Sequence, residues 1–529
     1  GVRGGARNGM SDERIAVFEE ANREAGFEWK DPGMAGARVV ADCSSQQSLD
    51  ESVIPKESSV MTCFRYIFDK DFFHNLKRET NRFGQEKRGQ NWVQLPLRQF
   101  YKFFALILHM CLVHKPVIDD YFSENAVLYT PFARTIGISR LLFKQILMAL
   151  HIADNSKFIP RGQVGHDPLY KINPLYQHLN RKFRVYTPGP NLTLDEAIFP
   201  FRGRVGFRVY MKNKPNKYGL RGELLCDAAN GIILSMEIYA GSGSGLDYSV
   251  SELVPRLLSD FQHRNYRVYM DRRYSSPTLF KKLLNLGVYA VGTVQSNRKF
   301  LPAVFKSGSL EKGSRIAKEC GQLLAVRWKD VRDVYMLSTV HPDEMVQTGG
   351  QDIRNQRHES LKPVSVVDYN KNKTGVDRHD QCSSYYPFDR KTVKWWRKLF
   401  FQLFQVGIIQ AHKYFHISNP NRKKPLRDFM TDVCLGLVEM SHVPEDVAVP
   451  TPSSVRALVR TSIDPKLVHM PALLPPTERK ENPTQRCAYC SNKTINGVFI
   501  KRRESRYMCK ACQVPLCVLC FEPYHSSSV

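Results

Sequence analysis

Aspartates stand at the ends of predicted strands and at the start of a predicted helix, and this pattern constrains the fold more than any other feature of the chain. Asp195 ends one strand-like apolar run, and Asp271 ends a later one. Asp377 and Asp380 are three residues apart, so a helix would place both carboxylates on one face. Such carboxylates can converge on Mg²⁺ or Mn²⁺, which prefer oxygen ligands. Two ions about 4 Å apart can activate an attacking oxygen and stabilise a leaving oxygen in phosphodiester chemistry.

Taken singly, each aspartate is weak evidence, because an Asp at a strand end is more often a turn residue or a helix cap. Their order along the chain is more specific. A β-hairpin with its turn at 229–231 follows Asp195, a later strand ends at Asp271, and the last pair of aspartates opens a helix. This order predicts an α/β fold with an RNase H-like core that acts on nucleic acid.

The remaining pattern divides the chain into segments. Residues 1–60 are rich in Gly, Ala, Ser and acids, which predicts a largely disordered leader with one short helix at 12–25. Apolar spacing of three and four residues predicts a helical region at 61–188. The other predicted segments are 189–297 and 363–449 as two parts of the α/β core, 298–362 as a β-rich segment, 450–476 as a Pro- and Ser-rich linker, and 477–529 as a cysteine-rich domain.

The charge is strongly positive and unevenly distributed. The 529 residues include 77 Lys and Arg against 51 Asp and Glu, a net charge of +26. The leader carries 7 basic and 11 acidic residues, so the rest of the chain has a net charge of +30. A basic body indicates a polyanionic partner, nucleic acid above all, although a solvated basic surface is the alternative. The longest apolar stretch, 103–113, is shorter than the roughly 20 residues of a membrane span. No signal peptide is recognisable, so secretion is not expected.

Two stretches combine basic and aromatic residues. Between 197 and 222 there are seven basic residues and no acid, interleaved with Phe and Tyr, and 390–398 repeats the combination. Basic side chains can neutralise phosphates, and aromatic rings can stack on unpaired bases. Either stretch alone could also be a solvated face beside core aromatics.

The tail holds three Cys-x₂-Cys pairs followed by a histidine. The seven candidate zinc ligands are Cys487, Cys490, Cys509, Cys512, Cys517, Cys520 and His525. Repeated Cys-x₂-Cys pairs indicate a zinc site, because the two thiolates of one tight turn can bind the same tetrahedral ion. A disulfide knot is the alternative. Either one four-ligand site has spare thiols, or a cross-brace holds two ions. The cross-brace would group the first Cys pair with the third, leaving the second pair and His525 for the other ion.

Several motifs resemble signatures of the piggyBac-type transposases and occur in the order of that family, from about residue 61 to the C-terminus. The tail also resembles that of the vertebrate piggyBac-element-derived group. The matching motifs are 201–204, 213–219, 292–294 with 297–299, 375–381 and, in the tail, 521–525.

The resemblance implies a function, a site and partners. The family cuts and pastes DNA at TTAA sites through hairpinned transposon ends, and its catalytic, Mg²⁺-binding carboxylates would be Asp195, Asp271, Asp377 and Asp380. Segment 61–188 would bind DNA and dimerise, 298–362 would be an insertion domain, and the zinc-binding tail would recognise transposon ends. A nuclear homodimer on double-stranded DNA, with no membrane partner, is expected. The residues expected to contact DNA are Arg202, Arg204, Lys214, Lys217, Tyr218, Arg298, Lys299, Lys391 and Trp395.

The chain departs from the family pattern beside its catalytic motifs. After Asp271 the family usually has Asn and then an aromatic residue, whereas this chain has Arg272 and Arg273. After the first Asp-Glu pair it has Ala197 in place of Ser or Gln. A cation next to a metal ligand either opposes metal binding or points away. The alternatives to an active transposase are a domesticated, catalytically weak or silent DNA- or chromatin-binding protein and, less well supported, a zinc-finger adaptor.

Overall fold

The structure is a computed structural model, and its described part is not continuous. It describes residues 12–34, 39–212, 214–351, 357–388, 390–443, 471–475, 477, 480–490, 494–495, 498–499, 504–509 and 514–526. The chain divides into two compact units. The first comprises 1–96, 110–114 and 146–433, and the second comprises 97–109, 115–145 and 434–529.

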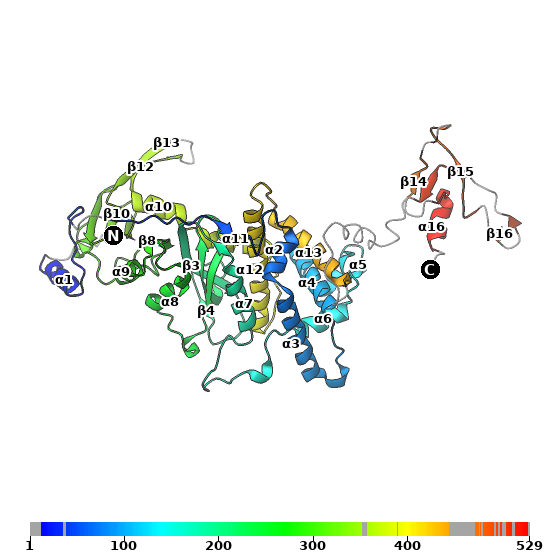
Figure 1. Ribbon diagram of the computed structural model, residues 1–529, viewed down its shortest axis with the longest axis horizontal. Coiled ribbons are helices and arrows are strands. Elements are labelled where there is room, and N and C mark those ends of the chain that lie inside the picture. Colours follow the sequence, from blue (N-terminus) through cyan, green and yellow to red (C-terminus); the bar gives the residue numbers. More distant parts are fainter. Residues whose placement is uncertain are drawn as a thin grey trace, which may run out of the picture. The chain divides into compact units, whose positions relative to one another are not determined.

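A nine-stranded mixed sheet forms the centre of the first unit (Figure 1). Its strand order is β4-β5-β3-β7-β8-β11-β10-β9, and β6 pairs with β5. Strand β5 pairs antiparallel with β3 and with β6, whereas β7 pairs parallel with β3 and with β8. This arrangement confirms the predicted RNase H-like core. The strands are β3 (Asn191–Pro200), β4 (Val209–Tyr210), β5 (Tyr218–Asp227), β6 (Ile233–Ile238), β7 (Arg267–Met270), β8 (Tyr289–Thr293), β9 (Arg315–Cys320), β10 (Leu323–Lys329) and β11 (Asp333–Ser338).

The segment after β8 is β-rich, as predicted, but three of its strands extend the nine-stranded sheet instead of forming a separate body. β11 pairs antiparallel with β8, and β10 and β9 follow outward. Tyr269, Val291 and Trp328 lie in one buried cluster that spans β7, β8 and β10, so this part shares the core. Only the hairpin of β12 (Met345–Gln351) and β13 (Arg357–Pro363) pairs outside the sheet.

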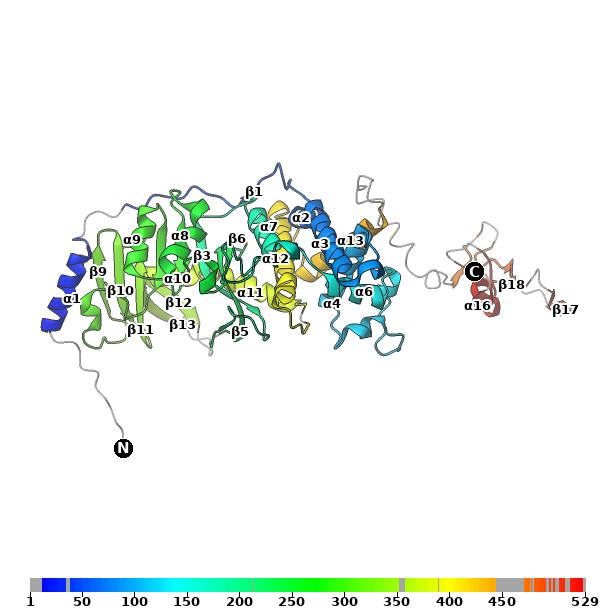
Figure 2. The same cartoon turned by 90° about the horizontal axis from the view of Figure 1, so that it is seen from below.

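Helices cover both faces of the sheet. Figures 1 and 2 show α9 on one side of the strands and α10 on the other. Helix α12 follows the loop after α11 and contains the predicted amphipathic stretch 395–415. The helices of the first unit are α1 (Asp12–Glu24), α2 (Val60–Ile67), α3 (Lys70–Arg88), α7 (Asn173–Phe183), α8 (Val250–Leu257), α9 (Pro277–Asn285), α10 (Val364–Asn372), α11 (Gly375–Tyr385) and α12 (Trp395–Ser418).

The prediction of a largely disordered leader is wrong for residues 12–34 and 39–60. The Phe27 ring stacks on Phe300 with centroids 5.1 Å apart, and Trp29 Nε1 donates to the Phe300 carbonyl at 3.0 Å. Farther along, β1 (Ser48–Leu49) pairs with β2 (Tyr186–Thr187). The overall composition of residues 1–60 did not reveal that a few aromatic residues attach this segment to the folded body.

The second unit contains helices of the predicted helical region, although the ends of α4 and α6 and the first half of α13 belong to segments of the first unit. The Phe103 and Phe143 rings pack 4.9 Å apart, and Cys434 Sγ approaches the Ala105 carbonyl at 3.2 Å. These contacts join α4, α6 and α13. The helices are α4 (Leu97–Leu112), α5 (Phe132–Thr135), α6 (Arg140–Ala149) and α13 (Leu426–His442).

The tail is a small module of short strand pairs and one helix, and most of the predicted linker lies outside the described residues. Strand pairs β14–β19, β15–β18 and β16–β17 are all antiparallel. The elements are β14 (Pro471–Leu473), β15 (Gln485–Arg486), β16 (Thr494–Ile495), β17 (Val498–Phe499), β18 (Glu504–Ser505), β19 (Tyr507–Cys509) and α16 (Val518–Ser526).

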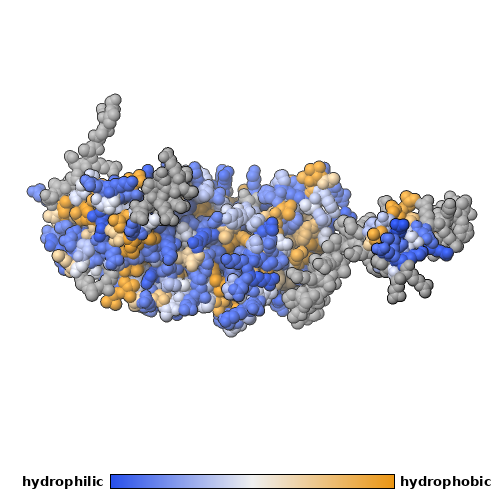
Figure 3. All heavy atoms as spheres, turned by 90° about the horizontal axis from the view of Figure 1, so that it is seen from above, coloured by the Kyte–Doolittle hydropathy of each residue, from blue (hydrophilic) through white to orange (hydrophobic). Residues whose placement is uncertain are grey.

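Hydrophilic residues cover most of the face drawn in Figure 3. Among the described residues, none of the helices has the length and apolar content needed to cross a bilayer.

Candidate active site and metal-binding module

Two neighbouring parallel strands bring the first two predicted aspartates together. Leu194 of β3 is in register with Met270 of β7, so Asp195 and Asp271, one residue farther on, lie side by side. Carboxylate oxygens of Asp195, Glu196 and Asp271 all lie within 4.8 Å of one another. The structure therefore groups two predicted residues with Glu196, which the sequence analysis did not select.

The start of α11 is held against β3, and this contact places the other two aspartates. A Cβ atom at Gly375 would lie 3.0 Å from Thr193 Oγ1, a separation that only glycine allows without adjustment. Thr193 Oγ1 donates to the Asn372 carbonyl at 2.6 Å. Asp377 follows Gly375, the contact point on α11, by two residues. Asp195 likewise follows Thr193, the contact point on β3, by two residues. Asp377 and Asp380 are not among the carboxylates grouped within 4.8 Å.

The electrostatics show that these carboxylates share one site. Burial is the largest cause that raises the pKa of Asp195, to about 8; Lys214 opposes the rise, and Glu196 and Asp271 add to it. Burial also raises the pKa of Asp380 to about 6, again opposed by Lys214 and reinforced by Asp377 and Glu196. The pKa of Asp271 is raised by burial too. These carboxylates lie close together and are largely removed from water. Such a group fits a divalent cation, because the charge of the cation would favour the ionised forms of the carboxylates.

Lys214 lies at this site and not on an open surface. Its Nζ donates to the carbonyl of Glu196 at 2.6 Å. The sequence placed Lys214 among the DNA contacts, and spacing alone could not show that the loop after β4 folds back over β3.

The two arginines after Asp271 differ in position. Arg272 is exposed, whereas the Arg273 guanidinium lies 3.3 Å from a carboxylate oxygen of Glu196. The backbone N–H of Arg273 donates to Asp271 Oδ1 at 2.7 Å. Arg298, predicted to contact DNA, donates from Nη2 to the carbonyls of Arg273 at 2.5 Å and Arg272 at 3.3 Å. Arg298 therefore holds the loop that carries Asp271.

The two basic and aromatic stretches meet in one groove of about 970 Å³. Arg202, Lys217 and Tyr218 line it from the first stretch, and Lys391 lines it from the second. Trp395 lies beside Phe207 with ring centroids 5.1 Å apart, which ties the stretches together. Arg204 and Lys299 are exposed but do not line the groove.

A second cavity, of about 320 Å³, adjoins this groove. Lys214 and Asp380 line it, and it shares Pro200, Asn216 and Lys398 with the groove. Of the carboxylates described above, Asp380 is the one that faces this cavity.

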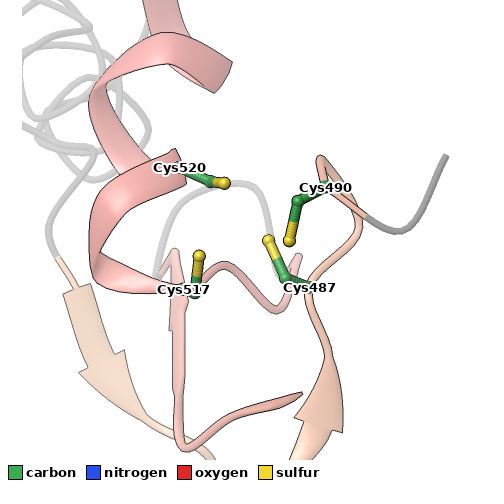
Figure 4. A group of neighbouring side chains, drawn as sticks. All are labelled: Cys487, Cys490, Cys517 and Cys520. Carbon is green, nitrogen blue, oxygen red and sulfur yellow. The ribbon is translucent and has the colours of Figure 1, made fainter. Parts of the chain in front are cut away.

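The tail brings four cysteines to one point (Figure 4). The sulfur atoms of Cys487, Cys490, Cys517 and Cys520 lie within 4.8 Å of one another, the first and third pairs that the cross-brace prediction groups. Burial raises the pKa of Cys487, but hydrogen bonds from backbone N–H groups, that of Cys490 first, outweigh it and lower the pKa to about 7. Four converging sulfurs with an acidified thiol fit a tetrahedral zinc ion.

The second predicted zinc set is only partly described. Cys509 is buried in the same cluster as the four cysteines. Cys512 and the side chain of His525 lie outside the described residues. The count of one or two ions stays a prediction.

Comparisons with known proteins agree with this geometry. The family model described as "Transposase IS4" matches residues 58–412, and one described as "DDE_Tnp_1-like zinc finger" matches residues 469–526. The human PiggyBac transposable element-derived protein 3 is 25% identical over 407 residues, 73% of this chain and 63% of that protein. The human PiggyBac transposable element-derived protein 2 is 22% identical over 65% of this chain and 60% of that protein. The chain thus spans about three fifths of the length of these curated relatives.

A solved structure shares the fold. The structure titled "Cryo-EM structure of piggyBac transposase synaptic complex with hairpin DNA (SNHP)" superposes with a TM-score of 0.67 at 22% identity. The match covers 89% of this chain and 98% of that one.

Proposed function

Because this chain belongs to the family of piggyBac-type transposases, we propose that it is a metal-dependent DNA transposase that cleaves and joins strands at TTAA sites through hairpinned transposon ends. The observation that carries the proposal is the convergence of the Asp195 and Asp271 carboxylates at adjacent strand ends, in a molecule whose basic groove adjoins a cavity lined by Asp380. The relative solved with hairpin DNA supports the hairpin step.

The residues of the site have separate roles in this proposal. Asp195 and Asp271 would hold Mg²⁺ or Mn²⁺ from adjacent strand ends, and Asp377 and Asp380 would complete the site from α11. When bound, the ions activate the attacking oxygen and stabilise the leaving oxygen. Lys214, bonded to the Glu196 carbonyl, places a positive charge beside the carboxylates, where the phosphodiester would lie.

The groove would bind the DNA backbone before cleavage. Arg202, Lys217 and Lys391 can neutralise phosphates, and Tyr218 can stack on an unpaired base. Double-stranded DNA, as transposon end and as target, is the proposed partner. Action on chromosomal DNA implies a nuclear location, and we propose a homodimer, because joining two ends requires two active sites.

The tail would recognise transposon ends. Its four grouped cysteines support a zinc-stabilised module, and a tethered module raises the effective concentration of the catalytic unit at the DNA end. Such a small module has little core of its own, so zinc would supply much of its folding energy.

Strand cleavage by the purified full chain on hairpin DNA carrying the gene's own flanking sequence tests the proposal. Asp195→Asn, Asp271→Asn and Asp377→Asn should each abolish cleavage in Mg²⁺ while DNA affinity is retained, because an amide is a poor ligand for the cation. Asp330→Asn is the matched control, since Asp330 is exposed in the turn between β10 and β11. Cleavage that persists in Asp271→Asn would refute the assignment.

The second candidate is a domesticated, silent DNA-binding protein. The basic residues that follow Asp271 favour it, because the family usually has Asn and an aromatic residue there. Excision from a plasmid carrying the flanking DNA separates the two. A wild-type chain that binds this DNA and never excises it would support the silent protein.

A further inference from the structure

Arg273 lies between two carboxylates on adjacent strands. Its Nη1 is 3.3 Å from Glu196 Oε2 on β3, and its Nη2 is 3.1 Å from Glu223 Oε1 on β5. Glu196 and Glu223 face each other directly in the β3–β5 register. Like charges opposite one another in a sheet repel, so a cation between them is needed to hold both in place.

Glu223 is the fixed end of this arrangement. It is 1% exposed, and Arg221 Nε lies 2.8 Å from its Oε1. The Tyr274 hydroxyl donates to its other oxygen, Oε2. A buried carboxylate with partners on both oxygens has little freedom, so Glu223 anchors Arg273.

Glu196 is the movable end. Its carboxylate lies close enough to those of Asp195 and Asp271 to reach the same cation. One of its oxygens, Oε2, is engaged by Arg273 and by the Tyr274 hydroxyl, the latter at 3.3 Å. These contacts tie Glu196 Oε2 to two side chains that also contact Glu223 on β5.

We propose that Arg273, anchored by Glu223, is a positioning residue that keeps Glu196 out of the metal's coordination set. The inference rests on the proposed function, because it assumes a divalent cation between Asp195 and Asp271. Mg²⁺ normally keeps several coordination positions for water and substrate phosphate. An additional carboxylate from β3, beside Asp195, would occupy one of them, so restraining Glu196 leaves room for the DNA.

The backbone supports this role for Arg273 and not for its neighbour. Arg298 holds the carbonyls of Arg272 and Arg273, and the N–H of Arg273 binds Asp271, so the loop has one orientation. In that orientation Arg272 is exposed. Arg272 therefore provides a matched control with the same charge one position away.

The test is the affinity of the full chain for Mn²⁺ without DNA, measured from the electron paramagnetic resonance signal of free Mn²⁺. Glu196→Gln is introduced into three backgrounds: wild type, Arg272→Gln and Arg273→Gln. In the first two backgrounds it should change the Mn²⁺ Kd by a similar factor, which reports only the charge removed near the ion. In the Arg273→Gln background it should weaken binding by at least about tenfold more than in the other two, because the released carboxylate has joined the ion.

The comparison separates positioning from simple charge. If Arg273 only repelled the cation, Glu196→Gln would have the same effect in every background, and the inference would be wrong. Should Arg273→Gln misfold because Glu223 loses a partner, the neutral pair Glu223→Gln with Arg273→Gln serves as the background and carries the same expectation. A wild-type chain that binds no Mn²⁺ would instead refute the metal site of the proposed function, and the positioning role with it.

Discussion

Replacing Gly292 with Ala would test how closely β7 and β8 must approach beside Asp271. Gly292 lies opposite Met270 in the parallel register of these strands. A Cβ atom at Gly292 would lie 2.5 Å from the Met270 carbonyl oxygen and 2.4 Å from Ser275 Oγ. Ordinary contacts require about 1 Å more, so the carbonyl just before Asp271 must move.

The cost has two sources. Overpacking between two strands of a closed core costs about 1–3 kcal/mol. Ser275 Oγ donates to the Asp271 carbonyl at 3.0 Å, and displacing it loses a hydrogen bond of about 1 kcal/mol. Together these predict a loss of about 2–4 kcal/mol of unfolding free energy or, for a unit of this size, a melting temperature lower by about 2–5 °C.

Thermal unfolding followed by circular dichroism measures this loss, with Gly349→Ala as the control. Gly349 also lies in a strand, β12, but no heavy atom is within 4 Å of its added Cβ. The control should melt within roughly 1 °C of the wild type, since its substitution meets open space. Equal melting temperatures for Gly292→Ala and Gly349→Ala would refute the reasoning.

Three further predictions concern other parts of the molecule. Cys487→Ser with Cys490→Ser should lower the zinc content of the full chain, measured by atomic absorption, and abolish preference for transposon-end over random DNA; an unchanged preference would exclude end recognition by the tail. Lys217→Gln should reduce the slope of log DNA affinity against log salt concentration by about 1. Lys423→Gln should leave the slope unchanged, because Lys423 is exposed and does not line the groove. Equal slopes for the two variants would mean that Lys217 does not contact a phosphate. Burial raises the pKa of Asp368, but hydrogen bonds from His341 and Tyr269 outweigh it and hold the pKa below the usual value. Its ionised form therefore stabilises the fold above the unfolded pKa of about 3.9, and this stabilisation is lost as pH falls through the folded pKa. Asp368→Asn should lower the unfolding free energy at pH 7, measured in urea, by about 1–3 kcal/mol. The difference in unfolding free energy between the variant and the wild type should become smaller below about pH 4. A difference that is the same at every pH would contradict this pH dependence.

Local patterns in the sequence were enough to predict the framework of the site. Asp195 and Asp271 could be selected because each follows an apolar run, and parallel strands of one sheet end at the same edge. The cysteine spacing likewise predicted that each Cys-x₂-Cys turn presents two sulfurs together, whereas the pairing of the first turn with the third was only one of two alternatives. The aspartates at the strand ends and the two sulfurs of each turn could be selected from short stretches of sequence, where chain geometry alone restricts what can meet.

Contacts between distant residues were decided only by the tertiary structure. Glu196, Glu223 and Arg273 come from three segments, and no spacing relates them, although an acidic residue in a predicted core strand was a signal that a partner existed. Lys214 and Arg298 were expected to contact DNA, yet the fold directs both to backbone carbonyls beside Asp195 and Asp271. Charge and composition indicate what a side chain can bind, but which partner it reaches depends on how the strands and loops close around it.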